Sequence, residues 1–185
     1  MPLPDKQKYT ADKFFKMFPE SNSERYELYE GEVVAMASPS IQHQNIVLGL
    51  GSEIRAYIKK NKGKCQVFVA PVDVKLTDDT VVIPDVFVVC DPSKIDDKRC
   101  NGAPDWVIEV TSSNYRTDYV DKLELYKEAG VREYWIINPE KKSVTVLIFE
   151  KNPANFMLYR FSDMIPVNIY KNTPIQLEIC IENLF

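Results

Sequence analysis

Residues 104–114 read PDWVIEVTSSN and place one acidic residue inside an apolar run. Residues 105–110 have the apolar density of a strand that is buried on both faces of a sheet. Glu109 stands among them, and the basic residues nearest to it in the sequence are Lys98, Arg99 and Arg116. Because a carboxylate in a dry strand is costly unless a cation or hydrogen bonds receive it, Glu109 is the first candidate for a functional residue.

Helical and strand-like patterns alternate on both sides of this strand. Before it, we expect a short helix at residues 9–18, a hairpin at 26–37, a longer helix at 41–60 and two strand-like runs at 66–76 and 81–90. After it, we expect an amphipathic helix at residues 117–129, a strand at 133–138 and trailing strands at 144–150, 155–161 and 175–179.

The helix at residues 117–129 is a crossover between two strands, 105–111 and 133–138. Such a connection makes the two strands parallel neighbours. The middle of the chain therefore has the order helix–strand–strand–strand–helix–strand. We predict a mixed central sheet flanked by helices, of the α/β (α+β) class, with additional N- and C-terminal strands. Since 185 residues suffice for one core, we expect a single domain over residues 1–185.

Charge and hydropathy limit the class of protein. The net charge of −4 counts against a nonspecific nucleic-acid coat protein, but a nuclease stays possible because its carboxylate cluster is acidic until metal binds. We find no apolar run of about 18 residues and no secretory signal, so we expect no membrane association and a cytoplasmic location. The four cysteines form no CxxC pair and are expected to be reduced: Cys65, Cys90, Cys100 and Cys180.

Two isolated acids fall on interior strands of the predicted sheet. Strand parity makes Asp85 the only charge on one face of the run 81–90, and Glu109 lies on the later strand. Two carboxylates held close together repel unless a divalent cation bridges them, and oxygen ligands of this kind suit Mg²⁺. Lys122 on the crossover helix can reach towards Glu109, where it can orient a water or stabilise charge on a phosphate.

This arrangement resembles the PD-(D/E)XK nucleases of the restriction-endonuclease-like superfamily. Those proteins carry an aspartate on one strand and the (D/E)XK motif on the next, in a core with the same order of elements. Pro84-Asp85 resembles the first part, and Glu109-Val110-Thr111 resembles the second. Thr111 stands where the motif has lysine, and Lys122 takes that place, as in some branches of the superfamily.

Longer segments resemble one family of the superfamily, the Uma-two restriction endonucleases, over about residues 24–140 and more weakly to the end. The segments are YELYEGEVVAMASPSIQHQ, VFVAPVDVKL, VVIPDVFVVC, GAPDWVIEVTSSN and DKLELYKEAGVREYWIINP. The resemblance implies a PD-(D/E)XK fold, cleavage of DNA with Mg²⁺ and often a homodimer. We expect Mn²⁺ to substitute for Mg²⁺.

The candidate site combines these lines. The expected catalytic residues are Asp85, Glu109 and Lys122. The expected metal ligands are Asp85, Glu109 and the carbonyl of Val110. Three more residues match family positions and are candidates for the site: His43, Glu27 and Asp73. These residues also have structural alternatives. Asp85 and Glu109 could be buried acids satisfied by backbone amides or ion pairs, and Lys122 could be an exposed lysine paired with Asp118. His43 could serve in the core or as a helix cap.

The leading hypothesis is a metal-dependent endonuclease that hydrolyses phosphodiester bonds of DNA. The alternative is a catalytically silent nuclease fold that serves as a binding or assembly module. A glycosidase with two carboxylates is disfavoured by Lys122 and by the lack of an aromatic sugar-binding motif. One such nuclease site cuts one strand, so we expect a C₂ homodimer formed by the strands after Asn138 or by the N-terminal hairpin. The recognition sequence and the choice between DNA and RNA stay open.

Overall fold

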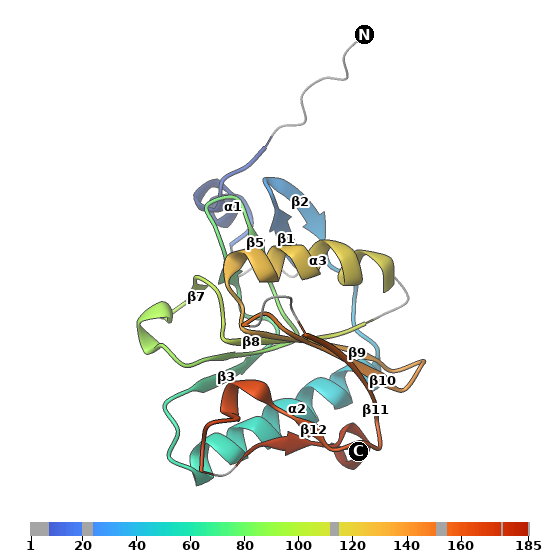
Figure 1. The fold of residues 1–185 in the computed structure, drawn as a ribbon. Helices are drawn as coiled ribbons and strands as arrows, with labels where there is room; N and C mark the ends of the chain where they lie inside the picture. The colour runs from blue at the N-terminus through green and yellow to red at the C-terminus, as the bar shows by residue number, and fades with distance from the viewer. Residues whose placement is uncertain (1–7, 20–23, 112–114, 151–154, 175, 185) are drawn as a thin grey trace.

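The computed structural model of the chain describes residues 8–19, 24–111, 115–150, 155–174 and 176–184. A six-stranded sheet with the order β11-β10-β9-β8-β6-β3 forms its centre. The helices α2 (Ile41–Lys60) and α3 (Tyr115–Ala129) cover its opposite faces (Figure 1). The strands are β3 (Gln66–Val69), β6 (Val86–Val89), β8 (Trp106–Val110), β9 (Glu133–Asn138), β10 (Ser143–Ile148) and β11 (Asn155–Arg160).

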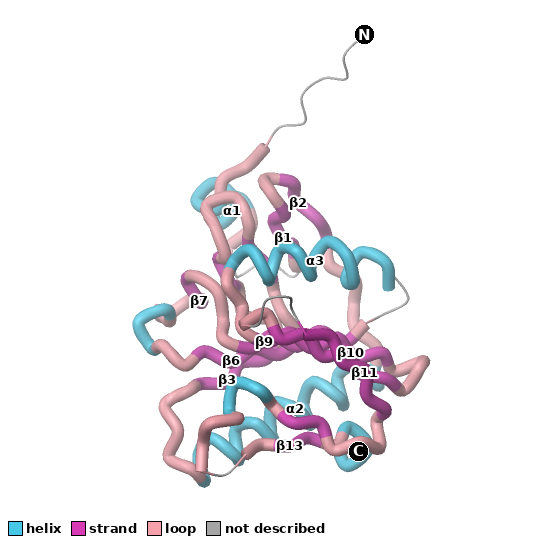
Figure 2. The backbone as a smooth tube through the Cα atoms, in the orientation of Figure 1, coloured by secondary structure: helices cyan, strands magenta, loops and turns pink. Residues whose placement is uncertain are grey.

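Smaller elements lie above and below this centre (Figure 2). A five-stranded sheet, β2-β1-β5-β4-β7, and α1 (Ala11–Met17) lie on the side of α3, and the C-terminal elements lie on the side of α2. The five strands are β1 (Tyr26–Tyr29), β2 (Glu32–Ala35), β4 (Val74–Lys75), β5 (Val81–Val82) and β7 (Cys100–Asn101). The C-terminal strands are β12 (Ile165–Pro166) and β13 (Glu178–Ile179), and the 3₁₀ turns are η1 (Pro92–Lys94), η2 (Asn168–Tyr170) and η3 (Ile181–Leu184).

The predicted fold class is confirmed, and so is the crossover. β8 and β9 are parallel neighbours, with Trp106 opposite Glu133 and Val110 opposite Ile137, and α3 connects them. The predicted hairpin and the helix over residues 41–60 are also present. None of the helices in the described ranges has both the length and the apolar character needed to cross a bilayer.

The two strand-like runs before residue 105 are each divided, which corrects the sequence-based expectation. The run 66–76 splits into β3 and β4, and the run 81–90 splits into β5 and β6. Pro71 and Pro84 stand at the two breaks, and proline has no N–H to give to a strand ladder. The prediction that Asp85 lies on one face of a continuous strand is therefore wrong, because Asp85 lies in the bend that precedes β6.

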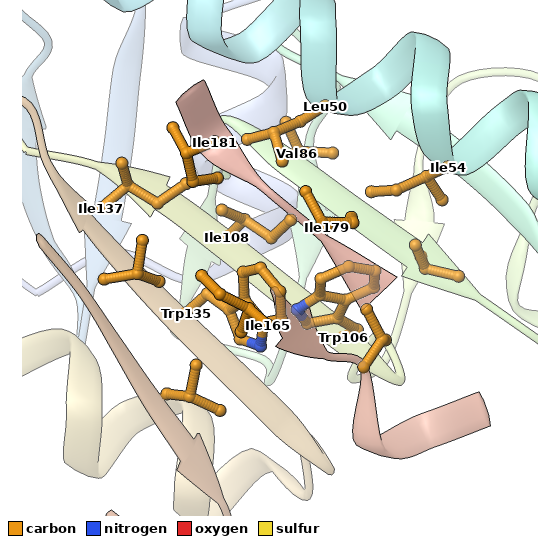
Figure 3. Packing of buried hydrophobic residues seen from close by; sticks show 14 of the residues in the cluster. Leu50, Ile54, Val86, Trp106, Ile108, Trp135, Ile137, Ile165, Ile179 and Ile181 are labelled. Carbon is orange, nitrogen blue, oxygen red and sulfur yellow. The ribbon is translucent and has the colours of Figure 1, made fainter. Parts of the chain in front are cut away.

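Side chains of the central strands alternate between two apolar clusters. On the side of α2, Leu50 and Ile54 pack over Ile108, and the C-terminal segment closes the cluster (Figure 3). On the side of α3, Tyr126 packs with Val107 and other residues of the sheet. Since successive side chains of a strand point to opposite faces, Glu109 follows Val107 to the side of α3.

One expectation about the cysteines is wrong. Cys65 and Cys90 form a disulfide, whereas Cys100 and Cys180 are free thiols, as expected. Strand register brings the two bonded cysteines together. Gln66 of β3 lies opposite Val89 of β6, so the next pair along the ladder is Cys65 with Cys90. The sequence gives no such register, since the pairing partner of β3 is 20 residues further along the chain.

Candidate active site

Glu109 lies buried between β8 and α3 and is received by two donors. Its Oε1 accepts a hydrogen bond from Lys122 Nζ at 2.9 Å and another from the Tyr126 hydroxyl at 2.7 Å. Lys122 and Tyr126 are four residues apart on α3, so they lie on one face of the helix, one turn from each other. The predicted approach of Lys122 to Glu109 is confirmed as a contact of two buried side chains.

Glu27 of β1 approaches the same lysine from the second sheet. Its Oε1 lies 3.7 Å from Lys122 Nζ and accepts a hydrogen bond from the backbone N–H of Ile83 at 2.8 Å. Its Oε2 accepts a hydrogen bond from the Tyr29 hydroxyl at 2.6 Å. Glu27 thereby connects β1, the segment that leads to Asp85, and α3.

Asp85 occupies the bend before β6 and reaches the end of β8. Its Oδ2 accepts a hydrogen bond from the backbone N–H of Val110 at 2.8 Å and lies 3.0 Å from His43 Nε2. His43 is in the first turn of α2, where its backbone N–H donates to the capping hydroxyl of Ser40. Asp85 thus contacts Val110, the residue after Glu109 on β8, although Asp85 itself lies in the bend between β5 and β6.

Burial and crowding of negative charge raise the pKa of Glu109 to about 8. Burial contributes most, the charges of Asp85 and Glu27 add to it, and Lys122 opposes it. Burial lowers the pKa of Lys122, but the two neighbouring glutamates outweigh this effect and raise it well above its ordinary value. The site therefore keeps a charged lysine and still holds more negative charge than the lysine can compensate.

The pKa of His43 reports the same excess of negative charge. Burial lowers it, but the hydrogen bond and charge of Asp85, the charge of Glu109 and the Val110 carbonyl together raise it. His43 Nδ1 is buried and has no hydrogen-bond partner among the described residues. His43 accordingly belongs to the charged group around Asp85. The position of His43 in the sequence does not by itself show this contact.

The donor set fits a hard divalent cation better than a soft one. Asp85 Oδ1 and Glu109 Oε2 receive no hydrogen bond from the described residues, and the Val110 carbonyl lies close enough to His43 to affect its pKa. Within the described ranges, however, no group of three or more His, Cys, Asp or Glu side chains has the arrangement of a metal cage. Two carboxylates with one carbonyl suit Mg²⁺, which keeps several waters and takes one or two carboxylates.

Six of the seven sequence-predicted site residues are joined by the contacts above. They are Glu27, His43, Asp85, Glu109, Val110 and Lys122. For Asp73 the structure gives a backbone role, since its carbonyl accepts a hydrogen bond from Cys100 N–H at 3.0 Å, and its place in the site stays a prediction. Asp118, the alternative partner of the lysine, lies outside the side chains that the structure describes.

Two tyrosines of the site were not predicted. Tyr126 packs against Tyr134 with 4.9 Å between ring centroids, and its hydroxyl also donates a hydrogen bond to Glu109. Tyr29 binds Glu27 from two residues further along the same strand. The available signal was spacing, because each tyrosine shares a helix or strand face with a predicted site residue.

One protein-family model and several solved structures are similar to this chain. The model of the Uma2 family, described as "Putative restriction endonuclease", matches residues 11–163. No curated protein matches the sequence. A crystal structure from Anabaena variabilis, described as "a putative nuclease belonging to DUF820", is similar with a TM-score of 0.76 and 22% sequence identity, over 96% of this chain and 97% of that chain. At this identity the likeness establishes the shared fold.

Proposed function

Because the chain belongs to the Uma2 (Uma-two) family, we propose that it is a Mg²⁺-dependent endonuclease that hydrolyses phosphodiester bonds of DNA. The observation that carries the proposal is the buried contact of Lys122 with Glu109 beside Asp85. A lysine next to two carboxylates is the set of groups that the PD-(D/E)XK resemblance implies. The family description supports DNA as the substrate.

Asp85, Glu109 and the Val110 carbonyl would hold the metal, with Mn²⁺ as a substitute for Mg²⁺. A bound Mg²⁺ supplies Lewis acidity towards the phosphate and lowers the pKa of a coordinated water. Lys122 is placed to orient the attacking water and to stabilise negative charge on a phosphate oxygen. Tyr126 fixes Glu109, and His43 and the Val110 N–H fix Asp85, so the carboxylates are held in place before substrate arrives.

We also propose that the two sheets act as one domain. Glu27 of the five-stranded sheet accepts a hydrogen bond from Ile83 and faces Lys122 of α3, which packs on the six-stranded sheet. The site therefore needs both sheets. This supports the single-domain expectation for residues 1–185.

A plasmid-nicking assay tests the proposed function directly. We expect supercoiled DNA to be converted to nicked or linear product in Mg²⁺ or Mn²⁺ and to stay intact in EDTA, because the carboxylates need the cation to receive a phosphate. Binding of DNA without cleavage in either metal would instead identify the catalytically silent binding module. An RNA substrate of matched length, run in parallel, separates deoxyribonuclease from ribonuclease activity.

The edge strand β11 is the surface that best fits a homodimer. Phe156 and Leu158 are 62% and 65% exposed, respectively. Phe161 N–H donates to the carbonyl of Lys142, the residue just before β10. Alternation along the ladder therefore turns the backbone groups of Phe156 and Leu158 away from β10. An outward row of backbone donors and acceptors with apolar side chains can pair with the same strand of a second copy.

Leu158→Lys is expected to separate the dimer while keeping the fold, because the leucine side chain contributes little to the core. Light scattering should give a dimer for the wild type and a monomer for the variant. The monomer should still nick plasmid but should lose linear product, since each strand needs its own site. A monomeric wild type at micromolar concentration would contradict the dimer prediction.

A further inference from the structure

Glu27 is a buried carboxylate whose two oxygens are both engaged. The Ile83 N–H holds Oε1 at 2.8 Å and the Tyr29 hydroxyl holds Oε2 at 2.6 Å. Neither donor carries a charge, so the negative charge of Glu27 is not neutralised by its anchors. The cation nearest to it among the described residues is Lys122, with 3.7 Å between Nζ and Oε1.

Glu109 cannot serve as the sole counter-ion of Lys122 throughout the reaction. The lysine and Tyr126 both donate to the same oxygen of Glu109, and the proposed cation draws on the same carboxylate. A divalent cation next to Glu109 also repels the ammonium group, and in a buried site this repulsion is strong. Lys122 therefore needs a second negative charge that the metal does not use.

Glu27 meets that requirement and does not resemble a metal ligand. Its oxygens are fixed by Ile83 and Tyr29, and it comes from β1 of the second sheet, whereas Glu109 comes from β8. Because its anchors are a backbone amide and a neighbouring tyrosine, the carboxylate stays in place when charges elsewhere in the site change.

We propose that Glu27 is the positioning residue of Lys122: it holds the ammonium group in the active site while Glu109 binds the metal. The inference rests on the proposed function for the identity of the site. It assigns to Glu27 neither metal binding nor contact with DNA. Tyr29 and Ile83 hold the carboxylate in the position that faces the lysine.

Glu27→Gln tests the proposal, because glutamine keeps the size of the side chain and an oxygen for the Ile83 N–H. We expect kcat for plasmid nicking to fall about 10- to 100-fold, with KM for DNA unchanged, because the substitution alters only the orientation of the lysine. Mg²⁺ affinity measured by calorimetry should stay within about twofold of the wild type. A weaker Mg²⁺ affinity with unchanged kcat would identify Glu27 as a metal ligand and overturn the proposal.

A double-mutant cycle with Lys122→Met separates positioning from general stability. If Glu27 acts through the lysine, Glu27→Gln should not slow nicking further in the Lys122→Met background. Equal slowing in both backgrounds would overturn the proposal.

Glu133→Gln is the matched control. Glu133 is a fully buried glutamate at the start of β9, opposite Trp106, and its carboxylate accepts hydrogen bonds from the Trp135 side chain and the Ile169 N–H. Its replacement should leave kcat unchanged.

The same double-mutant cycle can be measured by melting temperature, which requires no catalytic activity. We expect the Glu27–Lys122 coupling to be present in EDTA and to grow by at least about 3 °C in saturating Mg²⁺, because Glu27 then becomes the main counter-ion. Additive shifts in EDTA, or the same coupling in both conditions, would overturn the proposal. A wild type that cleaves no DNA but shows this coupling would refute the endonuclease function and leave the role of Glu27 intact.

Discussion

Glu109→Gln is expected to lower the rate of Mg²⁺-dependent DNA cleavage by about 10³-fold or more, because one of two proposed metal-binding carboxylates loses its charge. Glutamine retains an oxygen for Lys122 and Tyr126, so the fold should persist. Single-turnover nicking and Mg²⁺ calorimetry measure the two effects, and both activity and affinity should fall together. Glu53→Gln is the matched control, since Glu53 is an exposed glutamate in the middle of α2.

The same substitution has a predictable effect on stability. The pKa of Glu109 is raised from 4.5 to about 8 in the folded protein, so folding disfavours its ionised form. The contribution of Glu109 to stability is thus fully present below pH 4.5 and is lost as pH rises towards 8. Without metal, the variant should melt at the same temperature as the wild type or higher at pH 8, and the difference should shrink at pH 5.

A structural role for Glu109 predicts the opposite pattern. Loss of the partner of Lys122 and Tyr126 would then lower the free energy of unfolding by about 1–3 kcal/mol, and the melting temperature would fall at every pH. A Glu109→Gln protein that melts several degrees lower and still nicks DNA at the wild-type rate would refute the metal-site hypothesis. The sign of the shift and the rate together therefore separate the two roles.

Lys122→Met is expected to lower kcat by about 10²- to 10⁴-fold, because the site loses the group that orients water and stabilises phosphate charge. Methionine fills the volume of the lysine stem but leaves two buried glutamates without their cation. Breaking a buried ion pair of this kind costs about 3–5 kcal/mol, so the melting temperature should fall by roughly 10 °C. Mg²⁺ should restore part of that loss, since it supplies positive charge.

The measurement is single-turnover cleavage at a temperature where the variant is folded, combined with Mg²⁺ calorimetry. Metal affinity should be equal to that of the wild type or higher, because the carboxylates no longer share their charge with the lysine. If Lys122→Met cleaved DNA at the wild-type rate, the lysine would be a structural counter-ion without a role in catalysis. Lys171→Met serves as the control, since this lysine pairs with Glu150 outside the site.

Local sequence patterns were sufficient for the elements that build the core. The apolar run around Glu109 predicts β8, and the amphipathic pattern over residues 117–129 predicts the crossover helix α3. The parallel pairing of β8 with β9 follows from both. Lys122 could be placed near Glu109 for the same reason, because the two residues are only 13 positions apart and belong to one strand–helix unit. Short-range geometry is fixed by the periods of helix and strand.

The sequence by itself therefore determined the fold class, the family and the acid–lysine pair. Only the tertiary structure decided that Asp85 lies in a bend, that Cys65 and Cys90 are bonded, and that Glu27 and His43 reach the site. Glu27 meets the Ile83 N–H across 56 residues, and His43 meets Asp85 across 42. Such contacts depend on how two sheets and two helices dock. Docking is set by packing of the whole core, which no local period of the sequence records.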